Sequence, residues 1–264
     1  MVTHASSVSL PTVSLVIPAK NEEKNLPIVL SRIPEWIHEV VFVDGNSTDN
    51  TVEVARTLSD KVKIVRQTGR GKGNALRQGF AAATGDIIVA LDADGSTDPA
   101  EIPVLIAPLL SGWQFTKASR FMQGGGTADM TLYRSVGNKG LLFLVRLLFG
   151  GKYSDFNYGY NAFWAWTLDY ILPDVDGFEI EALITIRALR AGLKIAEVPS
   201  FELPRAHGQS HLKSIRDGIR ILKVILRERF AGRPMPIPDF PFRRLKPIDT
   251  HPTPVISATI KLAK

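Results

Sequence analysis

The fold of this chain is decided by the stretch GDIIVALDAD, residues 85–94. Its apolar run, 87–91, is typical of a parallel strand that is covered on both faces. Asp92 and Asp94 follow where this strand emerges, and two carboxylates so close together repel each other unless a cation lies nearby. Mg²⁺ and Mn²⁺ prefer such oxygens and commonly hold substrate phosphates as well. The stretch therefore favours metal-assisted chemistry on a phosphorylated substrate, and the alternative is a turn whose Asp side chains cap a helix near Pro99.

Strand and helix patterns alternate around this stretch. Strands are predicted at 13–17, 40–43, 62–65 and 85–91, with helices between them at 21–33, 48–58 and 74–83. This order predicts an α/β fold with a mostly parallel sheet, helices on both faces and right-handed crossovers. Ligands of such sheets bind beyond the carboxyl ends of the strands. We therefore expect the loops 18–21, 44–48 and 92–96 to meet at one crevice.

The second half of the chain has less regular patterns. They predict strands at 114–119, 159–166 and 193–198, and helices at 132–149, 178–191 and 215–230. The glycine-rich segment 121–129 is predicted to be a mobile lid loop. We expect a single domain over 12–230, preceded by a disordered segment, 1–11, and followed by a proline-rich tail, 231–264.

Composition narrows the classes of protein that fit. The 264 residues are enough for one large core, and the absence of cysteine excludes disulfides, zinc–thiolate sites and thiol catalysis. The chain has neither a secretory signal pattern nor a run of roughly 18 apolar residues, so we expect a cytoplasmic protein. A net charge of +6 suits an anionic partner or serves solubility alone. Nucleic acid is not an expected partner, because the aromatic residues do not interleave with a basic patch.

Three polar motifs lie at or near strand ends. In PAKNEE, 18–23, Glu22 can accept a hydrogen bond from a ribose or a base, or it simply begins a helix. In DGNSTDNT, 44–51, Asp44 is free to bind the same ligand. GRGKGN, 69–74, precedes a helix, so that its backbone and Lys72 can contact phosphate, although a flexible loop fits the glycines equally well.

Taken together and in order, the motifs resemble those of family 2 glycosyltransferases of the GT-A fold, and most of all the branch that transfers sugars to polyprenyl (dolichyl) phosphate. The likeness covers 13–230. It rests on PAKNEE, VDGNSTDNT, GKGNA, Asp92-Ala93-Asp94, Ser119-Arg120, residues 155–159, GFEIE at 177–181, EVP at 197–199 and RAHGQS at 205–210.

The resemblance implies an inverting, metal-dependent transfer from a UDP- or GDP-sugar, and it divides the site residues into three sets. The base and ribose would be held by Pro18, Ala19, Glu22 and Asp44. The diphosphate would be held by Mg²⁺ or Mn²⁺ on Asp92 and Asp94, with Lys72, Arg120, Arg205 and Ser210 as further phosphate contacts. The acceptor side would be lined by Asp155 and Glu179, which are, with Asp94, the candidate catalytic residues.

The acceptor has two alternatives. A polyprenyl phosphate is already anionic and needs little help from a base, whereas a soluble hydroxyl compound would need Asp155 or Glu179 as general base. A non-catalytic nucleotide-sugar-binding module is disfavoured by the intact pair of aspartates. The apolar pattern 141–149 is either a buried helix or one that dips into a bilayer, and the basic helix 215–230 either binds anionic lipid or is merely solvated. Peripheral contact with the inner face of the membrane is therefore one expectation.

Overall fold

The computed structural model describes residues 10–58, 60–128, 130–208 and 214–232. Within them, a seven-stranded sheet has the order β3-β2-β1-β4-β7-β5-β8. Its strands are β1 (Val13–Ala19), β2 (Glu39–Asp44), β3 (Val62–Arg66), β4 (Ile87–Ala90), β5 (Phe115–Ser119), β7 (Asn161–Trp164) and β8 (Ile195–Pro199). All neighbours are parallel except that β7 runs antiparallel to β4 and β5. The predicted mostly parallel α/β sheet is confirmed.

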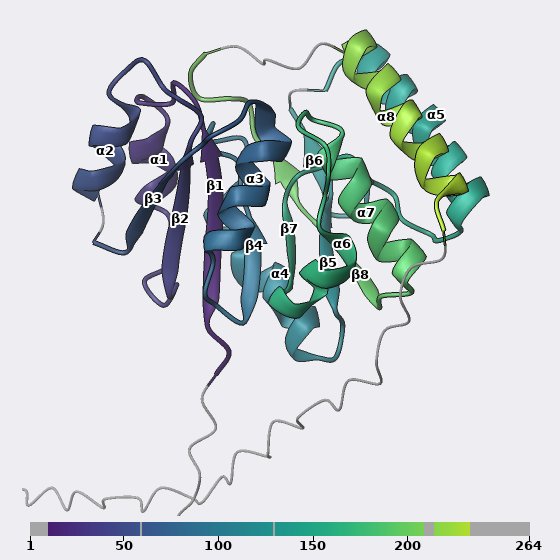
Figure 1. The fold of residues 1–264 in the computed structure, drawn as a ribbon, viewed down its shortest axis with the longest axis horizontal. Helices are drawn as coiled ribbons and strands as arrows, with labels where there is room; N and C mark the ends of the chain where they lie inside the picture. Colours follow the sequence, from purple (N-terminus) through teal and green to yellow (C-terminus); the bar gives the residue numbers. More distant parts are fainter. Residues whose placement is uncertain (1–9, 59, 129, 209–213, 233–264) are drawn as a thin grey trace, which may run out of the picture. The chain divides into compact units, whose positions relative to one another are not determined.

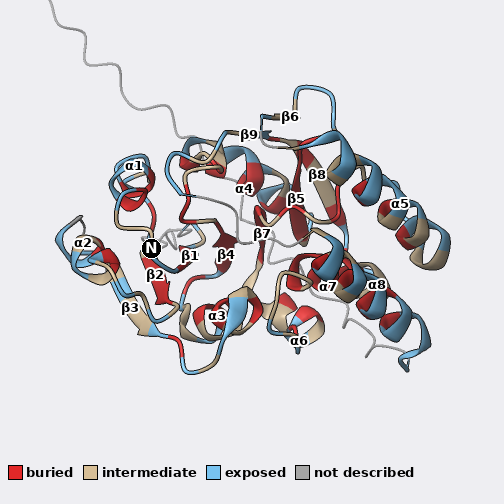
Figure 2. Ribbon diagram, turned by 90° about the horizontal axis from the view of Figure 1, so that it is seen from above, coloured by how far each residue is buried: buried red, intermediate tan, exposed pale blue. Residues whose placement is uncertain are grey.

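Helices cover both faces of the sheet (Figures 1 and 2). One face is covered by α1 (Leu26–Leu30), α2 (Thr51–Leu58) and α4 (Ile102–Leu110), and the other by α3 (Gly71–Ala82), α6 (Leu168–Ile171) and α7 (Ile180–Ala191). Two short 3₁₀ helices, η1 (Pro99–Glu101) and η2 (Ala165–Thr167), lie in connections. Because both faces are covered, the strands can be apolar almost throughout, as the run in β4 is.

The helices α5 (Leu132–Phe149) and α8 (Ser214–Phe230) lie side by side next to α7 (Figure 1). A separate apolar cluster holds them there, in which Leu142 and Val145 of α5 pack with Ile221 and Val224 of α8. Phe143 and Leu147 of α5 nevertheless remain 67% and 68% exposed, so the alternative of a fully buried helix is wrong. None of the described helices is long and apolar enough to span a bilayer.

Two predicted helices begin later than the sequence pattern indicates. The helix expected from residue 21 begins only at Leu26, because Asn21 has a φ of 58°, which the interior of a right-handed helix excludes. The helix expected from residue 48 begins at Thr51, after a turn in which the Asp49 carboxylate accepts a hydrogen bond from the Thr51 amide. In both cases, a polar residue suited to capping belongs to a loop that precedes the helix.

The glycine-rich segment has regular structure in its second half. Gly126 and Thr127 form β6, which pairs in parallel with β9 (Phe201–Glu202). The Thr127 hydroxyl donates a hydrogen bond to the Glu202 carboxylate at 2.5 Å. Two residues of the predicted lid loop are therefore paired with another strand in this structure. Asp129, the last residue of that loop, lies outside the described residues.

Candidate active site

The carboxyl ends of β1, β2 and β4 bring the first set of predicted residues together. Ala19 at the end of β1 lies opposite Asp44 at the end of β2, and β4 lies on the other side of β1. Parallel strands end at the same edge of a sheet, so the residues that follow them share one crevice. Pro18 and Ala19 form one wall of this edge, next to Asp44, which is only 4% exposed.

Hydrogen bonds between side chains and backbone connect the loops after β1 and β2. The Asn21 side-chain oxygen Oδ1 accepts from the Thr48 backbone amide at 2.8 Å, and the Ser47 hydroxyl accepts from the Asn21 backbone amide at 3.1 Å. Asp44 Oδ1 accepts from the Ser47 amide at 2.9 Å. Asn46 has a φ of 60°, a left-handed conformation that asparagine tolerates better than most residues. The backbone of the crevice is therefore shaped by its own polar side chains.

Lys72 connects the metal-binding candidates with α7. Its Nζ lies 2.6 Å from Asp92 Oδ1 and 2.8 Å from Glu181 Oε1. Burial alone would lower the pKa of Lys72, but the two carboxylates outweigh burial and raise it, so the side chain stays protonated. The Gly73 amide donates to the Asp176 carbonyl at 2.8 Å, and a Cβ at Gly73 would lie only 2.2 Å from a backbone oxygen of that loop. The glycine motif is thus a close packing contact that directs Lys72 into the crevice.

Arg205 holds the second carboxylate of the pair. Its Nη2 lies 2.6 Å from Asp94 Oδ2, and its Nη1 lies 3.5 Å from Glu22 Oε1. Burial raises the pKa of Glu22, and the neighbouring Asp94 carboxylate raises it further, against a hydrogen bond from Asn25 that lowers it. Arg205 therefore joins the loop after β4 to the loop after β1.

The chemistry of this group of side chains fits a divalent ion. Asp92 and Asp94 offer carboxylate oxygens from a single loop. Four carboxylates, those of Glu22, Asp92, Asp94 and Glu181, face the two cations already named, which leaves an excess of two negative charges. Among the described residues, no group of three or more His, Cys, Asp or Glu side chains could hold a metal by itself. Two carboxylates with substrate phosphates completing the coordination is the arrangement typical of Mg²⁺ sites.

Arg120 and Asp155 form a buried ion pair. Arg120 Nε lies 2.7 Å from Asp155 Oδ2, with side chains 6% and 0% exposed. Arg120 Nη1 contacts Glu202 at 3.1 Å, and the guanidinium lies 4.6 Å from the centre of the Tyr158 ring. Burial raises the pKa of Asp155, but Arg120 outweighs burial and holds it below its usual range. The enclosure of Asp155 and its pairing with Arg120 argue against its predicted role as general base, because the carboxylate has no exposed surface and is already engaged. All three Arg120 nitrogens are likewise engaged by carboxylates rather than free for phosphate.

Glu179 has a different environment, at the start of α7. Its Oε2 is buried and has no hydrogen-bond partner among the described residues. A Cβ at Gly177 would lie 2.3 Å from this oxygen and 2.9 Å from Arg220 Nη1, so both side chains crowd the same glycine. A buried carboxylate oxygen without a partner is uncommon in folded proteins and points to a bound ligand. The remaining predicted site residue, Ser210, lies outside the described residues.

Three charged residues of this region were not singled out from the sequence. Glu181 holds Lys72, Glu202 holds Arg120, and Lys117 lies in β5 with a side chain that is fully buried. The available signal was a charge inside an otherwise apolar element, since a buried charge requires a partner. Lys117 Nζ finds oxygen partners in the Tyr158 carbonyl at 2.9 Å and the Asn161 side chain at 3.3 Å.

Because Lys117 is buried, we expect the free energy of unfolding to depend on pH. Burial lowers the pKa of Lys117 from 10.5 to about 8, although Asp155 and Glu181 act to raise it. Between these values the unfolded chain binds a proton that the folded chain lacks, so the free energy of unfolding rises with pH. From pH 7 to pH 10, we expect the wild type to gain about 2 kcal/mol relative to Lys117→Met. Urea unfolding of both proteins at both pH values measures this, and equal changes would refute it.

Comparison with known proteins shows to which family the chain is similar. Residues 14–168 match the family model of glycosyl transferase family 2. The dolichol-phosphate mannosyltransferase of Pyrococcus furiosus is 34% identical over 212 residues, which cover 76% of this chain and 59% of that protein. The chain thus spans less than two thirds of that relative. Glycosyltransferase AglJ of Haloferax volcanii is 30% identical over 229 residues, which cover 84% of this chain and 74% of that protein.

A solved structure supports the same assignment. Glucosyl-3-phosphoglycerate synthase from Mycobacterium tuberculosis, in complex with Mn²⁺, UDP-glucose and phosphoglyceric acid, superposes with a TM-score of 0.69. It is 26% identical, and the match covers 84% of this chain and 81% of that one. The predicted GT-A fold and enzyme class are confirmed by these likenesses. The chain belongs to glycosyl transferase family 2.

Proposed function

We propose that this glycosyltransferase moves a sugar from a UDP- or GDP-sugar to a polyprenyl phosphate, with Mg²⁺ or Mn²⁺ at Asp92 and Asp94. Two likenesses support this proposal. The Mycobacterium tuberculosis enzyme is described with Mn²⁺ and UDP-glucose, and the relative from Pyrococcus furiosus is named a dolichol-phosphate mannosyltransferase. The oxygen ligands and the excess negative charge of the crevice suit the same kind of donor complex.

In this proposal, different residues of the crevice bind different parts of the donor. Glu22 and Asp44 hold the base and ribose at the ends of β1 and β2. A bound divalent ion would neutralise the leaving nucleoside diphosphate. Lys72 fixes the position of Asp92, and Glu181 in turn fixes Lys72. The acceptor approaches from the side of α7 and attacks the anomeric carbon opposite the leaving group, which inverts its configuration.

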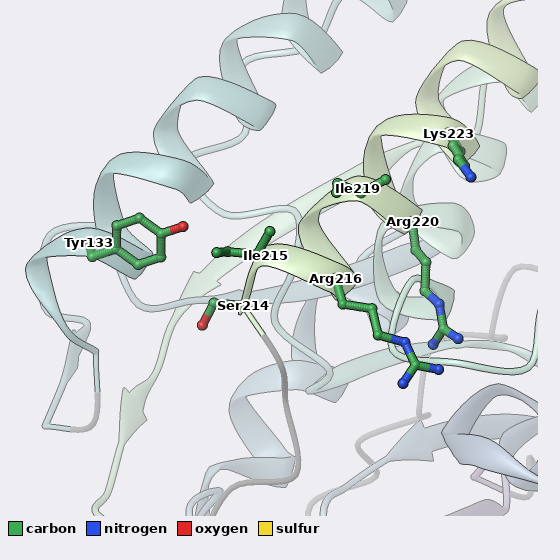
Figure 3. A pocket seen from close by; sticks show the side chains of 7 residues that line it. All are labelled: Tyr133, Ser214, Ile215, Arg216, Ile219, Arg220 and Lys223. Carbon is green, nitrogen blue, oxygen red and sulfur yellow. The ribbon is translucent and has the colours of Figure 1, made fainter.

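The observation that carries the choice of acceptor is a groove of about 740 Å³ at the N-terminal ends of α5 and α8 (Figure 3). Its wall combines apolar side chains with cations: Tyr133, Ser214, Ile215, Arg216, Ile219, Arg220 and Lys223. Arg220 lies against Gly177, next to Glu179, so the groove adjoins the acceptor side of the site. An anionic headgroup on an apolar chain matches both components of this wall.

The proposal includes contact with the membrane in which such acceptors lie. On α8, the exposed apolar residues recur at helical spacing: Ile215, Ile219, Leu222, Leu226 and Phe230. On α5, Leu132, Val136, Phe143 and Leu147 form a similar exposed row. Contiguous exposed apolar surface is uncommon on soluble monomers and marks interaction sites. With cations beside the row on α8, this surface suits the headgroup region of an anionic bilayer.

The direct test of function is an acceptor comparison with the purified full chain. A panel of UDP- and GDP-hexoses with Mn²⁺ is offered to polyprenyl phosphate in detergent, to phosphoglyceric acid and to water. We expect sugar transfer only to the polyprenyl phosphate, with the product in the organic phase. Transfer to phosphoglyceric acid alone would reject the lipid acceptor but not the donor or the metal.

Membrane contact predicts binding to anionic vesicles. Replacing Arg216, Arg220 and Lys223 with Gln should weaken binding by about 1 kcal/mol per charge. Added salt should weaken the binding of the wild type as well, because surface charges are screened. Vesicle sedimentation at low and physiological ionic strength measures both effects.

The matched control removes three exposed cations from the opposite end of the sheet. Arg32 follows α1, Arg56 lies in α2 and Lys63 lies in β3, and these elements are on the side of the fold away from α8 (Figure 1). Their replacement with Gln lowers net charge equally but leaves the α8 surface intact. Equal weakening in both triple variants would show non-specific attraction and contradict docking through α8.

A soluble hydroxyl acceptor is the second candidate, and Glu179 favours it. One of its carboxylate oxygens has no hydrogen-bond partner within the described ranges of the chain, and a general base needs such an oxygen. Glu179→Gln would then abolish transfer to a hydroxyl compound. The same change should reduce transfer to a phosphate acceptor far less, because that nucleophile is already ionised.

A further inference from the structure

The segment after β9 crosses the loop that carries the metal-binding candidates. We refer to residues 203–208 as the strap. The Leu203 amide donates to the Ser96 carbonyl at 2.9 Å, and the His207 carbonyl accepts from the Asn25 side chain at 3.2 Å. A Cβ added at Gly95 would lie 3.5 Å from the Ala206 side chain. The strap is therefore packed on the Asp94 loop at one point and attached to the loop after β1 at another.

Arg205 of the strap occupies one oxygen of the Asp94 carboxylate. Asp94 Oδ2 contacts Arg205 at 2.6 Å, and Asp94 Oδ1 accepts from the Ser96 amide at 2.9 Å. The Asp94 side chain is only 10% exposed, so little of the carboxylate remains for another partner. A divalent ion that binds Asp94 must therefore share this carboxylate with the guanidinium or displace it.

Lys72 and Arg205 would keep different ion pairs if a metal bound the carboxylates of Asp92 and Asp94. Lys72 would lose Asp92 but would keep its ion pair with Glu181 at 2.8 Å, and this remaining pair would hold the Lys72 side chain in place. Among the described residues, Arg205 would retain a contact with Glu22 alone, at 3.5 Å. It also lies in irregular backbone, in which Gly208 has a φ of +82°, rather than in a helix or strand. Arg205 is thus the cation that can move.

We propose that Arg205 and the divalent ion compete for Asp94, so that metal loading releases the Arg205 side chain from the Asp94 carboxylate. This inference rests on the proposed metal site. Arg205 neutralises Asp94 when the donor is absent, and once released it is free to pair with the donor diphosphate. Metal binding, the position of the Arg205 side chain and donor binding are then coupled, and the coupling is reciprocal.

The test measures binding of Mn²⁺ alone to the full chain, from the electron paramagnetic resonance signal of the free ion. Without its competitor, Arg205→Gln should bind Mn²⁺ about tenfold more tightly than the wild type. Arg205→Ala should show the same gain. At saturating Mn²⁺, UDP or GDP should bind Arg205→Gln more weakly than the wild type, because the released guanidinium is missing. Unchanged or weaker Mn²⁺ binding in both variants would overturn the proposal.

Arg32→Gln is the matched control, because it removes one positive charge from an ion pair with Asp98, four residues beyond Asp94. Arg32→Gln should change the affinity for Mn²⁺ by less than twofold. If it bound Mn²⁺ as tightly as Arg205→Gln does, the gain would result from the lower net charge, and the proposed competition would be overturned. Asp92→Asn and Asp94→Asn distinguish a failure of the proposed metal site from a failure of the proposed competition. If neither weakens Mn²⁺ binding, the metal site itself fails. If both do and Arg205→Gln shows no gain, only the competition fails.

Discussion

Asp92→Asn and Asp94→Asn should each lower the rate of sugar transfer about a thousandfold, which corresponds to about 4 kcal/mol of transition-state stabilisation. Each change keeps the size of the side chain but removes a charge and one good metal ligand. The leaving diphosphate would then develop its charge with weaker compensation, so the turnover number is expected to fall more than substrate binding does. Release of UDP or GDP at saturating donor, with Mg²⁺ or Mn²⁺, measures this.

Asp98→Asn is the matched control for these variants. The Asp98 carboxylate accepts from the Ala100 amide at 3.0 Å and pairs with Arg32 at 2.9 Å, away from the two aspartates that face Lys72 and Arg205. It should retain turnover within about threefold. All three variants are expected to unfold at urea concentrations close to that of the wild type. Near-wild-type turnover of both Asp92→Asn and Asp94→Asn would remove the basis for a metal at this loop.

Arg120→Gln should lower the free energy of unfolding by about 3–5 kcal/mol, because it leaves a buried carboxylate without its counter-charge. Asp155 is fully enclosed, and Glu202 would lose the same partner. Urea unfolding at pH 7, monitored by tryptophan fluorescence and circular dichroism together, gives this value. The pairing also supports the β6–β9 sheet, since Glu202 contacts both Arg120 and Thr127.

Two further variants decide whether the cost arises from the unpaired charge. Adding Asp155→Asn to Arg120→Gln removes that charge, so the double variant should be more stable than the sum of the single changes predicts. Arg32→Gln breaks an ion pair whose side chains are 46% and 21% exposed, and it should cost less than about 1 kcal/mol. Equal costs for Arg120→Gln and Arg32→Gln would contradict a buried, structural ion pair.

The crevice could be predicted from sequence because its strands and their loops are contiguous. Each apolar run predicts a strand, each polar motif follows directly, and the single hand of parallel crossovers places the loops at the same edge. Asp44, Asp92 and Asp94 therefore lie where the patterns predicted. Where the first helix begins could not be predicted in this way, because Asn21 bonds to Thr48 of another loop and takes a left-handed conformation there.

The sequence by itself determined the parallel half of the sheet, the family and the pair of carboxylates that we propose as metal ligands, because these depend on local pattern and residue type. Only the tertiary structure decided which charges pair. It enclosed Asp155 with Arg120, placed Lys72 between Asp92 and Glu181, and left a Glu179 oxygen without a hydrogen-bond partner in the part of the chain that the structure describes. The physical reason is that pairing depends on distance and burial among segments far apart in the chain. Strand and helix periodicity carries neither quantity.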